Sequence, residues 1–144
     1  MEKENAISLI LVDDHAMIRQ TWKMLLERDS RINIVAECSS GSEAITMAEK
    51  LQPDVMLMDI NMAPINGFEA TRTIVQKDPS IKIIGVSINN QPSYARNMVD
   101  IGAKGYVTKN SSREEMLQAI IEVYNGGIYM CKEITQKMGK GNIS

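Results

Sequence analysis

The sequence predicts an α/β fold in which a five-stranded parallel sheet is covered by helices on both faces. Short apolar runs alternate strictly with helical stretches along the chain, a pattern typical of parallel strands joined by right-handed helical crossovers. The clearest runs are continuously apolar, as expected of strands buried on both sides. The expected strands are residues 7–12, 32–37, 55–58, 81–86 and 106–107.

Start and stop signals delimit the five expected helices. Three helices begin with a polar residue followed three positions later by glutamate, a capping-box pattern: Ser40 with Glu43, Asn66 with Glu69, and Ser112 with Glu115. The first helix is expected over about residues 15–28, where Ile18, Trp22 and Leu25 recur at helical spacing. Pro92 suits the first turn of the fourth helix, and Gly102 suits its end.

The alternating pattern predicts a single domain with short flanking segments. At 144 residues the chain is long enough to bury a sizeable core. The pattern stops at Asn125, and Gly126 and Gly127 close the domain. We therefore expect an N-terminal tail over residues 1–5, the domain over 6–126, and a C-terminal linker or tail over 127–144.

Composition argues against several classes of function. A net charge of −2 gives no general attraction to nucleic acid or anionic lipid. No apolar run approaches the roughly 20 residues that cross a bilayer, and the polar, acidic start lacks the layout of a signal peptide. Cys38 and Cys131 show no metal-ligand spacing and are expected to be reduced thiols. The sequence thus predicts a cytoplasmic protein with no membrane partner.

Polar side chains stand where the expected strands end. Asp13 and Asp14 follow the first strand, Asp59 the third, Ser87 the fourth and Lys109 the fifth. In open parallel sheets, ligands bind outside the carboxyl ends of the strands, so these side chains should converge on one cleft. Neighbouring strands lie about 4.8 Å apart, and carboxylates that close together require a cation, for which Mg²⁺ is the common choice beside phosphate.

This constellation suits phosphoryl transfer. A carboxylate can attack as the nucleophile, here Asp59, while the metal and Lys109 neutralise charge on the transferring group and Ser87 hydrogen-bonds it. Each residue alone has a simpler interpretation: the Asp13–Asp14 pair as a helix cap, Asp59 as a turn residue, and Lys109 as a solvated side chain. Their occurrence in order at successive strand ends favours the site. His15 is expected to be an exposed residue of the first helical turn and not a metal ligand.

Four segments together resemble the receiver domain of two-component response regulators. They are LILVDDHAMIR, DVMLMDINMAPINGFEATR, IIGVSINN and GAKGYVTKNSSREEMLQAI. The resemblance covers roughly residues 6–126 and implies a flavodoxin-like fold with strand order 2-1-3-4-5. It also implies a signalling module without an enzymatic function beyond the phosphorylation and dephosphorylation of its own aspartate.

The resemblance assigns roles to individual residues. Asp59 accepts a phosphoryl group from a sensor histidine kinase. Mg²⁺ is held by Asp13, Asp14, Asp59 and the backbone carbonyl of Asn61. Ser87 and Lys109 contact the phosphoryl oxygens. Ser87 and Tyr106 form the switch, and the face around the fourth helix, fifth strand and fifth helix changes its partners, with a homodimer through that face as one outcome. Asn61 and Asn89 occupy the positions that influence how water reaches the acyl phosphate.

A narrower resemblance connects the chain to regulators of the LuxR/NarL type. It is carried by DDH at the first acidic site, by GAKGYVTKNSS and AIIEVYNGG, and by GGIYMCKEI, which resembles the linker to a helix-turn-helix output domain. That output domain, through which such regulators bind DNA and control transcription, is absent from these residues. An excised receiver is favoured over a stand-alone one, because Ile128, Tyr129, Met130 and Ile134 are expected to have no further segment to pack against.

Three departures from the family pattern keep alternative interpretations open. Ala63 stands where the family usually has proline and Pro64 follows it, Ile88 replaces a small residue, and Asn110 follows Lys109 in place of proline. The first two would fit a pseudo-receiver, an interaction module without regulated phosphorylation. A haloacid-type aspartyl phosphatase is a third hypothesis, but it needs an acid two positions after the nucleophile, where this chain has Asn61.

Overall fold

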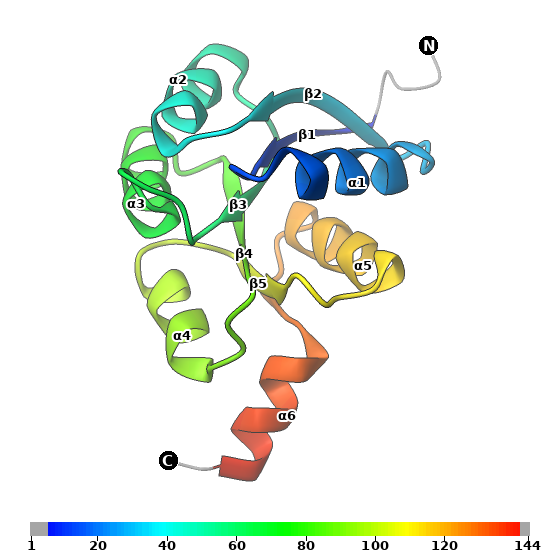
Figure 1. Cartoon of the computed structure of the whole chain (residues 1–144), viewed down its shortest axis with the longest axis vertical. Coiled ribbons are helices and arrows are strands. Elements are labelled where there is room, and N and C mark those ends of the chain that lie inside the picture. The colour runs from blue at the N-terminus through cyan, green and yellow to red at the C-terminus, as the bar shows by residue number, and fades with distance from the viewer. Residues whose placement is uncertain (1–5, 142–144) are drawn as a thin grey trace.

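The computed structural model describes residues 6–141 and contains one parallel sheet of six strands, with the order β2-β1-β3-β4-β5-β6 (Figure 1). The predicted order 2-1-3-4-5 is confirmed, but the predicted number of strands is wrong because a sixth strand joins the far edge. The strands are β1 (Ile7–Val12), β2 (Ile32–Cys38), β3 (Val55–Asp59), β4 (Lys82–Ser87), β5 (Gly105–Thr108) and β6 (Tyr129–Met130).

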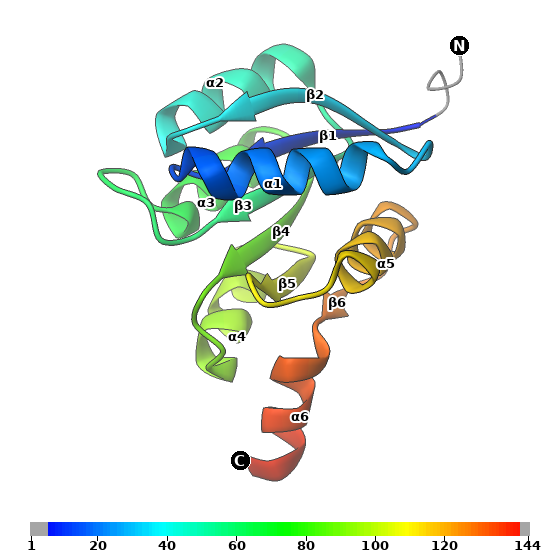
Figure 2. The same cartoon turned by 45° about the vertical axis from the view of Figure 1, so that its right-hand side comes forward.

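Helices cover both faces of this sheet, as the alternating pattern predicts. Helices α1 and α5 lie on one face, and α2, α3 and α4 lie on the other (Figures 1 and 2). A final helix, α6, follows the short strand β6 and lies beside α4. The helices are α1 (Ala16–Glu27), α2 (Gly41–Leu51), α3 (Gly67–Lys77), α4 (Pro92–Asp100), α5 (Arg113–Tyr124) and α6 (Lys132–Gly141). The domain is therefore a doubly wound α/β fold.

The middle of the sheet forms the core. Strand β3 is buried along its whole length, and its neighbours β1 and β4 are buried at all but one position each. The side chains of Leu9, Ile10, Met56 and Ile83 are completely buried. Successive side chains of a strand point to opposite faces, so a strand covered by helices on both sides must be apolar throughout. This requirement explains the continuous apolar runs.

The three predicted caps form. Ser40 Oγ accepts a hydrogen bond from the Glu43 N–H at 3.1 Å, and Asn66 Oδ1 accepts one from the Glu69 N–H at 2.9 Å. Ser112 Oγ accepts one from the Glu115 N–H at 3.0 Å. These bonds satisfy first-turn amides that have no partner within the helix.

The C-terminal segment corrects the sequence analysis. The prediction that the βα pattern stops at Asn125 is wrong, because β6 pairs in parallel with the free edge of β5 and α6 follows it. The expectation that Ile128, Tyr129, Met130 and Ile134 have no further segment to pack against is wrong for three of them: Ile134 is completely buried, Tyr129 is almost completely buried, and Met130 packs against the core. Ile128 does remain exposed. A two-residue strand is too short for periodicity to reveal it.

The predicted N-terminal tail, residues 1–5, lies outside the described residues, as do residues 142–144. Within residues 6–141 no helix combines the length and apolar character that crossing a membrane requires.

Candidate functional site

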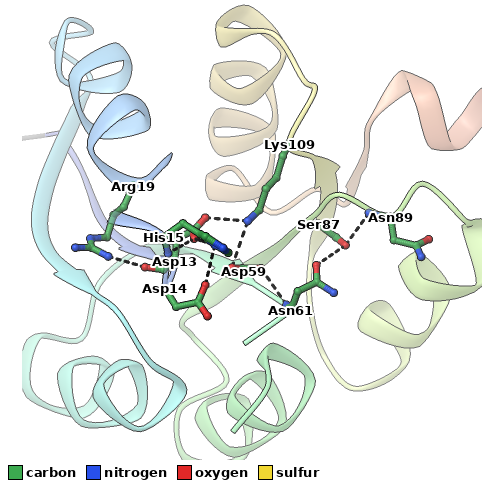
Figure 3. Close-up of polar contacts among 9 residues, drawn as sticks. All are labelled: Asp13, Asp14, His15, Arg19, Asp59, Asn61, Ser87, Asn89 and Lys109. Carbon is green, nitrogen blue, oxygen red and sulfur yellow. Dashed lines mark hydrogen bonds and ion pairs between the residues drawn. The ribbon is translucent and has the colours of Figure 1, made fainter. Parts of the chain in front are cut away.

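Five of the predicted site residues converge at the carboxyl edge of the sheet (Figure 3). Asp13 and Asp14 follow β1, Asp59 ends β3, Ser87 ends β4, and Lys109 follows β5. Because all four strands run in the same direction, their ends bring these side chains together at one edge of the sheet. Asp59 has only 1% of its surface exposed, and Asp13 is also buried.

Lys109 joins the two buried acids. Its Nζ lies 3.1 Å from Asp13 Oδ2 and 3.3 Å from Asp59 Oδ2, and the lysine side chain is only 11% exposed. The register of the sheet supports this arrangement, because the Lys109 N–H donates to the Ser87 carbonyl at 2.8 Å and so continues the pairing of β5 with β4. The structure therefore brings together the three charged residues that the sequence analysis assigned to the first, third and fifth strands.

The surroundings of Asp59 act on its pKa in both directions. Burial raises the pKa of Asp59 above its ordinary value, and the nearby charge of Asp13 raises it further. The Asn61 N–H, which donates to Asp59 Oδ1 at 2.9 Å, and the Lys109 ammonium both act in the opposite direction. A cation bound among these oxygens would stabilise the ionised form in the same way as Lys109.

Four side chains can offer ligand atoms to a metal ion. One atom each from Asp13, Asp14, His15 and Asp59 lies within 4.8 Å of the others. The donor set is dominated by carboxylate oxygens, which suit a hard divalent cation such as Mg²⁺. The partial exposure of Asp14 leaves the site accessible to ions and water.

His15 and Arg19 also contact the acidic loop, although the sequence analysis gave neither of them a role in the site. His15 Nδ1 lies 3.0 Å from Asp14 Oδ1 and 3.4 Å from Asp13 Oδ1, and the ring is 64% exposed, in line with the expected exposed position. Arg19 donates from Nη1 to the Asp13 carbonyl at 2.6 Å and from Nε to Glu37 Oε1 at 3.2 Å. The four-residue spacing between His15 and Arg19 was the available signal, because residues four apart lie on one side of a helix. His15 directly precedes α1, and its carbonyl accepts a hydrogen bond from the Arg19 N–H at 3.0 Å.

Ser87 and Asn61 form a second, uncharged part of the site. Ser87 is completely buried; its Oγ donates to Asn61 Oδ1 at 2.9 Å and accepts from the Asn89 N–H at 2.9 Å. The predicted dephosphorylation-tuning residues are thus both linked to Ser87, Asn61 through its side chain and Asn89 through its backbone. The side chain of Asn89 accepts from the Gln91 N–H at 2.8 Å, at the start of α4.

Tyr106 connects β5 to the loop between β4 and α4. Its side chain is completely buried, and its hydroxyl donates to the Asn89 carbonyl at 2.9 Å. Burial raises the pKa of this phenol, which stays in the neutral, hydrogen-donating form. The backbone of Asn89 is therefore hydrogen-bonded to both residues that the sequence analysis assigned to the switch: its N–H donates to Ser87, and its carbonyl accepts from Tyr106.

The comparisons with known proteins decide the family. A family model described as the response regulator receiver domain matches residues 9–121. The chain belongs to this family. It is 36% identical over 137 residues to the transcriptional regulatory protein DegU of Brevibacillus brevis, a match covering 95% of this chain and 58% of that protein. It is 34% identical over 132 residues to the response regulator GacA of Pseudomonas aeruginosa, covering 92% of this chain and 62% of GacA.

A solved structure confirms both the family and the narrower LuxR-type resemblance of this receiver domain. It is that of a two-component response regulator of the LuxR family from Aurantimonas sp. SI85-9A1, with a TM-score of 0.90 at 32% sequence identity. That match covers 94% of this chain and 96% of the solved one. The chain spans about three fifths of the length of the two curated relatives.

The structure also places the three departures of this receiver domain from the family pattern. Ile88 is 75% exposed, so its side chain is directed to solvent and is not packed over Asp59. The peptide bond between Ala63 and Pro64 is cis, whereas the bond between Lys109 and Asn110 is trans. Gly67, at the start of α3, explains how the loop after β3 stays close to the sheet: an added Cβ would lie 2.5 Å from the Asp59 carbonyl oxygen.

Proposed function

We propose that this receiver domain is a phosphorylation-dependent signalling switch whose Asp59 accepts a phosphoryl group from a sensor histidine kinase in the cytoplasm. The observation that carries the proposal is the placement of Lys109 Nζ between Asp13 and Asp59, at the open end of a parallel sheet. An acidic cluster alone would suit a metal site. An acidic cluster with a fixed lysine can provide two cations, the bound metal ion and the lysine ammonium, one on each side of a transferring anion.

The acidic cluster fits Mg²⁺. Asp13, Asp14 and Asp59 would hold the ion together with the backbone carbonyl of Asn61, and the remaining positions would be left for water and a phosphoryl oxygen. The ion would supply charge neutralisation at the phosphoryl group. Asp13 and Asp14 would position it, while Arg19, bonded to the Asp13 carbonyl, would hold their loop in place.

The transfer itself requires one oxygen of Asp59. That carboxylate oxygen attacks the phosphorus of a phosphohistidine; the new O–P bond forms as the P–N bond breaks, and its electron pair returns to the imidazole nitrogen. The Asn61 N–H on Oδ1 would orient the carboxylate during attack. Lys109, already 3.3 Å from Oδ2, would move its charge onto the phosphoryl oxygens.

The switch would begin at Ser87. A phosphoryl oxygen on Asp59 is a stronger acceptor than the amide oxygen of Asn61, to which Ser87 now donates. Turning the hydroxyl to the phosphoryl group would move the Asn89 N–H that is bonded to it, and Tyr106 would follow through its bond to the Asn89 carbonyl. The face made of α4, β5 and α5 would then differ between the two states.

A groove beside the site offers a route for the kinase. It lies between α1 and the segment leading into α5, has a volume of about 520 Å³, and is lined by Met17, Trp22, Lys109 and Arg113, among others. Because Lys109 belongs to both the groove and the site, a partner seated there would bring its phosphohistidine up to Asp59.

Control of transcription is the proposed output. DegU is named a transcriptional regulatory protein. We assign residues 6–126 to the receiver, and the segment after them, whose strand β6 extends the receiver's sheet, would lead toward a DNA-binding helix-turn-helix domain. A homodimer through the α4-β5-α5 face would be one readout of phosphorylation. DNA would be contacted only through the output domain.

Intact-mass measurement tests the proposal. Wild-type protein is incubated with Mg²⁺ and a small phosphoryl donor such as acetyl phosphate, beside Asp59→Asn and the control Asp100→Asn, which changes an exposed acid of α4. We expect one added phosphoryl group on wild type and on the control, and none on Asp59→Asn.

Other outcomes separate the alternatives. No adduct on wild type would support the pseudo-receiver. Many turnovers of donor without accumulation of an adduct would support a phosphatase, although the amide of Asn61 provides no general acid.

A further inference from the structure

Glu133, the second residue of α6, accepts hydrogen bonds from two segments that border the site. Its Oε2 accepts from Asn90 Nδ2 at 2.6 Å, and its Oε1 accepts from Thr108 Oγ1 at 2.8 Å. Asn90 belongs to the loop between β4 and α4, and Thr108 is the last residue of β5. Both bonds are made to an ionised carboxylate, which makes them short and strong, and they hold the pKa of Glu133 below its ordinary value.

Both donors are next to residues of the site. Thr108 directly precedes Lys109, whose Nζ lies between Asp13 and Asp59. Asn90 directly follows Asn89, whose N–H donates to Ser87 Oγ. Glu133 thus spans the two strand ends that would respond to a phosphoryl group on Asp59.

The rest of the segment is anchored away from the site. Glu115 Oε2, on α5, accepts from the Tyr129 hydroxyl at 2.8 Å and from the Lys132 N–H at 2.7 Å. Strand β6 pairs with β5, and both Cys131, directly before α6, and Ile134, in its first turn, are completely buried. These contacts keep the start of the segment attached, so a change at Glu133 acts on the docking of the rest of α6 and not on the attachment of β6.

We infer that Glu133 is a positioning residue that couples the occupancy of the Asp59 site to the docking of α6. The inference rests on the proposed function. A phosphoryl group draws Ser87 Oγ toward Asp59, and Asn89 and Asn90 follow because they are joined to that hydroxyl by a hydrogen bond and by the backbone. The hydrogen bond from Asn90 to Glu133 is already short, at 2.6 Å, so a movement of Asn90 with Ser87 lengthens or breaks it. The phosphorylated state therefore holds α6 less tightly.

Coupling of this kind is reciprocal. If a phosphoryl group weakens the docking of α6, then weakening that docking strengthens the binding of a phosphoryl mimic by the same factor. A residue that only stabilises α6 has no such effect on the distant site. This difference separates coupling from a purely structural role.

The test uses beryllofluoride with Mg²⁺ on the full chain. Binding is followed by ¹⁹F NMR, and α6 by amide hydrogen exchange, in wild type, Glu133→Ala, Glu133→Gln and the control Gln136→Ala. Gln136 is an exposed polar residue of the same helix. Bound beryllofluoride should speed exchange of the α6 amides in wild type and Gln136→Ala by about fivefold.

The variants should show the reciprocal effect. In Glu133→Ala the α6 amides should exchange rapidly with or without the mimic, and the mimic should bind about fivefold more tightly than to wild type. Glu133→Gln, which keeps one acceptor oxygen, should fall between the two.

Three results would overturn the inference. If beryllofluoride binds wild type but leaves α6 exchange unchanged, or binds Glu133→Ala no more tightly, the coupling is refuted and the phosphorylation proposal stands. If beryllofluoride does not bind wild type at all, both proposals fail.

Discussion

Replacing Lys109 by methionine should destabilise the protein in the absence of Mg²⁺, and by more at neutral than at acid pH. The change keeps most of the apolar side-chain volume but removes the positive charge that lies 3.1 Å from Asp13 and 3.3 Å from Asp59. Asp59 is then left in a buried position with a negative neighbour.

The magnitude follows from the geometry. At these distances each ion pair has a Coulomb energy of about 5 kcal/mol at an effective dielectric constant of about 20, and about 1 kcal/mol in water. The cleft is open on the side of Asp14, which is 36% exposed, so water partly replaces the lost charge. We expect a net loss of about 2 kcal/mol in the free energy of unfolding, somewhat below the cost of breaking a fully buried pair. For a chain of this length that corresponds to about 6–8 °C in melting temperature.

The pH dependence has a definite sign. Burial and Asp13 already raise the pKa of Asp59 in the folded protein, and losing Lys109 raises it further. The folded state of the variant then binds more protons than the unfolded state. Its stability therefore falls as pH rises from the ordinary range of aspartate through the raised pKa of Asp59. The loss should therefore be smaller at about pH 4 than at about pH 7.

Urea unfolding at both pH values measures the effect. Lys104→Met is the matched control, since it removes the same charge from an exposed position. Adding Asp59→Asn to Lys109→Met should recover most of the loss, because one of the two facing charges disappears. An equal loss at both pH values, or no recovery in the double variant, would refute the electrostatic account of the cleft.

Three further predictions concern the site. Mg²⁺ at 100 times its Kd should stabilise wild type by about 2.7 kcal/mol, and it should stabilise Asp14→Ala much less. Equal shifts in the melting temperature of the two proteins would exclude the acidic cluster as the metal site. Ser87→Ala should still bind beryllofluoride, but hydrogen exchange over α4, β5 and α5 should no longer respond to it, because the link from the anion to Asn89 is lost; an unchanged response would remove Ser87 from the switch. Wild type should lose its phosphoryl group at a slow to moderate rate, and Asn89→Glu should change the phosphoryl lifetime measured by intact mass, because a carboxylate there can act as a base toward water; an unchanged lifetime would remove position 89 from the account.

The positions of the charged site residues could be predicted because the topology of a parallel sheet leaves few alternatives. Asp13, Asp59 and Lys109 each follow an apolar run, and parallel strands bring their carboxyl ends to one edge. The helix caps were equally predictable, since Ser40 needs only the amide of Glu43, three residues away. Both inferences use local spacing and one general rule of topology.

The contacts of the neutral residues could not be predicted in the same way. The bond from Ser87 to Asn61 and the bond from Tyr106 to the Asn89 carbonyl join residues 26 and 17 positions apart, and each depends on which way a side chain turns within the cleft. Periodicity left Tyr106 as either an ordinary strand residue or a switch element. Packing decides its burial, and the switch role remains a prediction.

The sequence by itself determined the helix caps and the placement of the charged residues at the strand ends, because these follow from patterns within a few residues and from the single direction in which parallel strands run. The strand order was predicted from the resemblance to the receiver family. Only the tertiary structure decided that the C-terminal segment adds a strand to the sheet and continues as a helix. A two-residue strand has no period to detect, and it forms because the edge of β5 offers unpaired backbone groups. The bond from Asn90 to Glu133 spans 43 positions, so it exists only once the sheet has brought β5, α4 and α6 together.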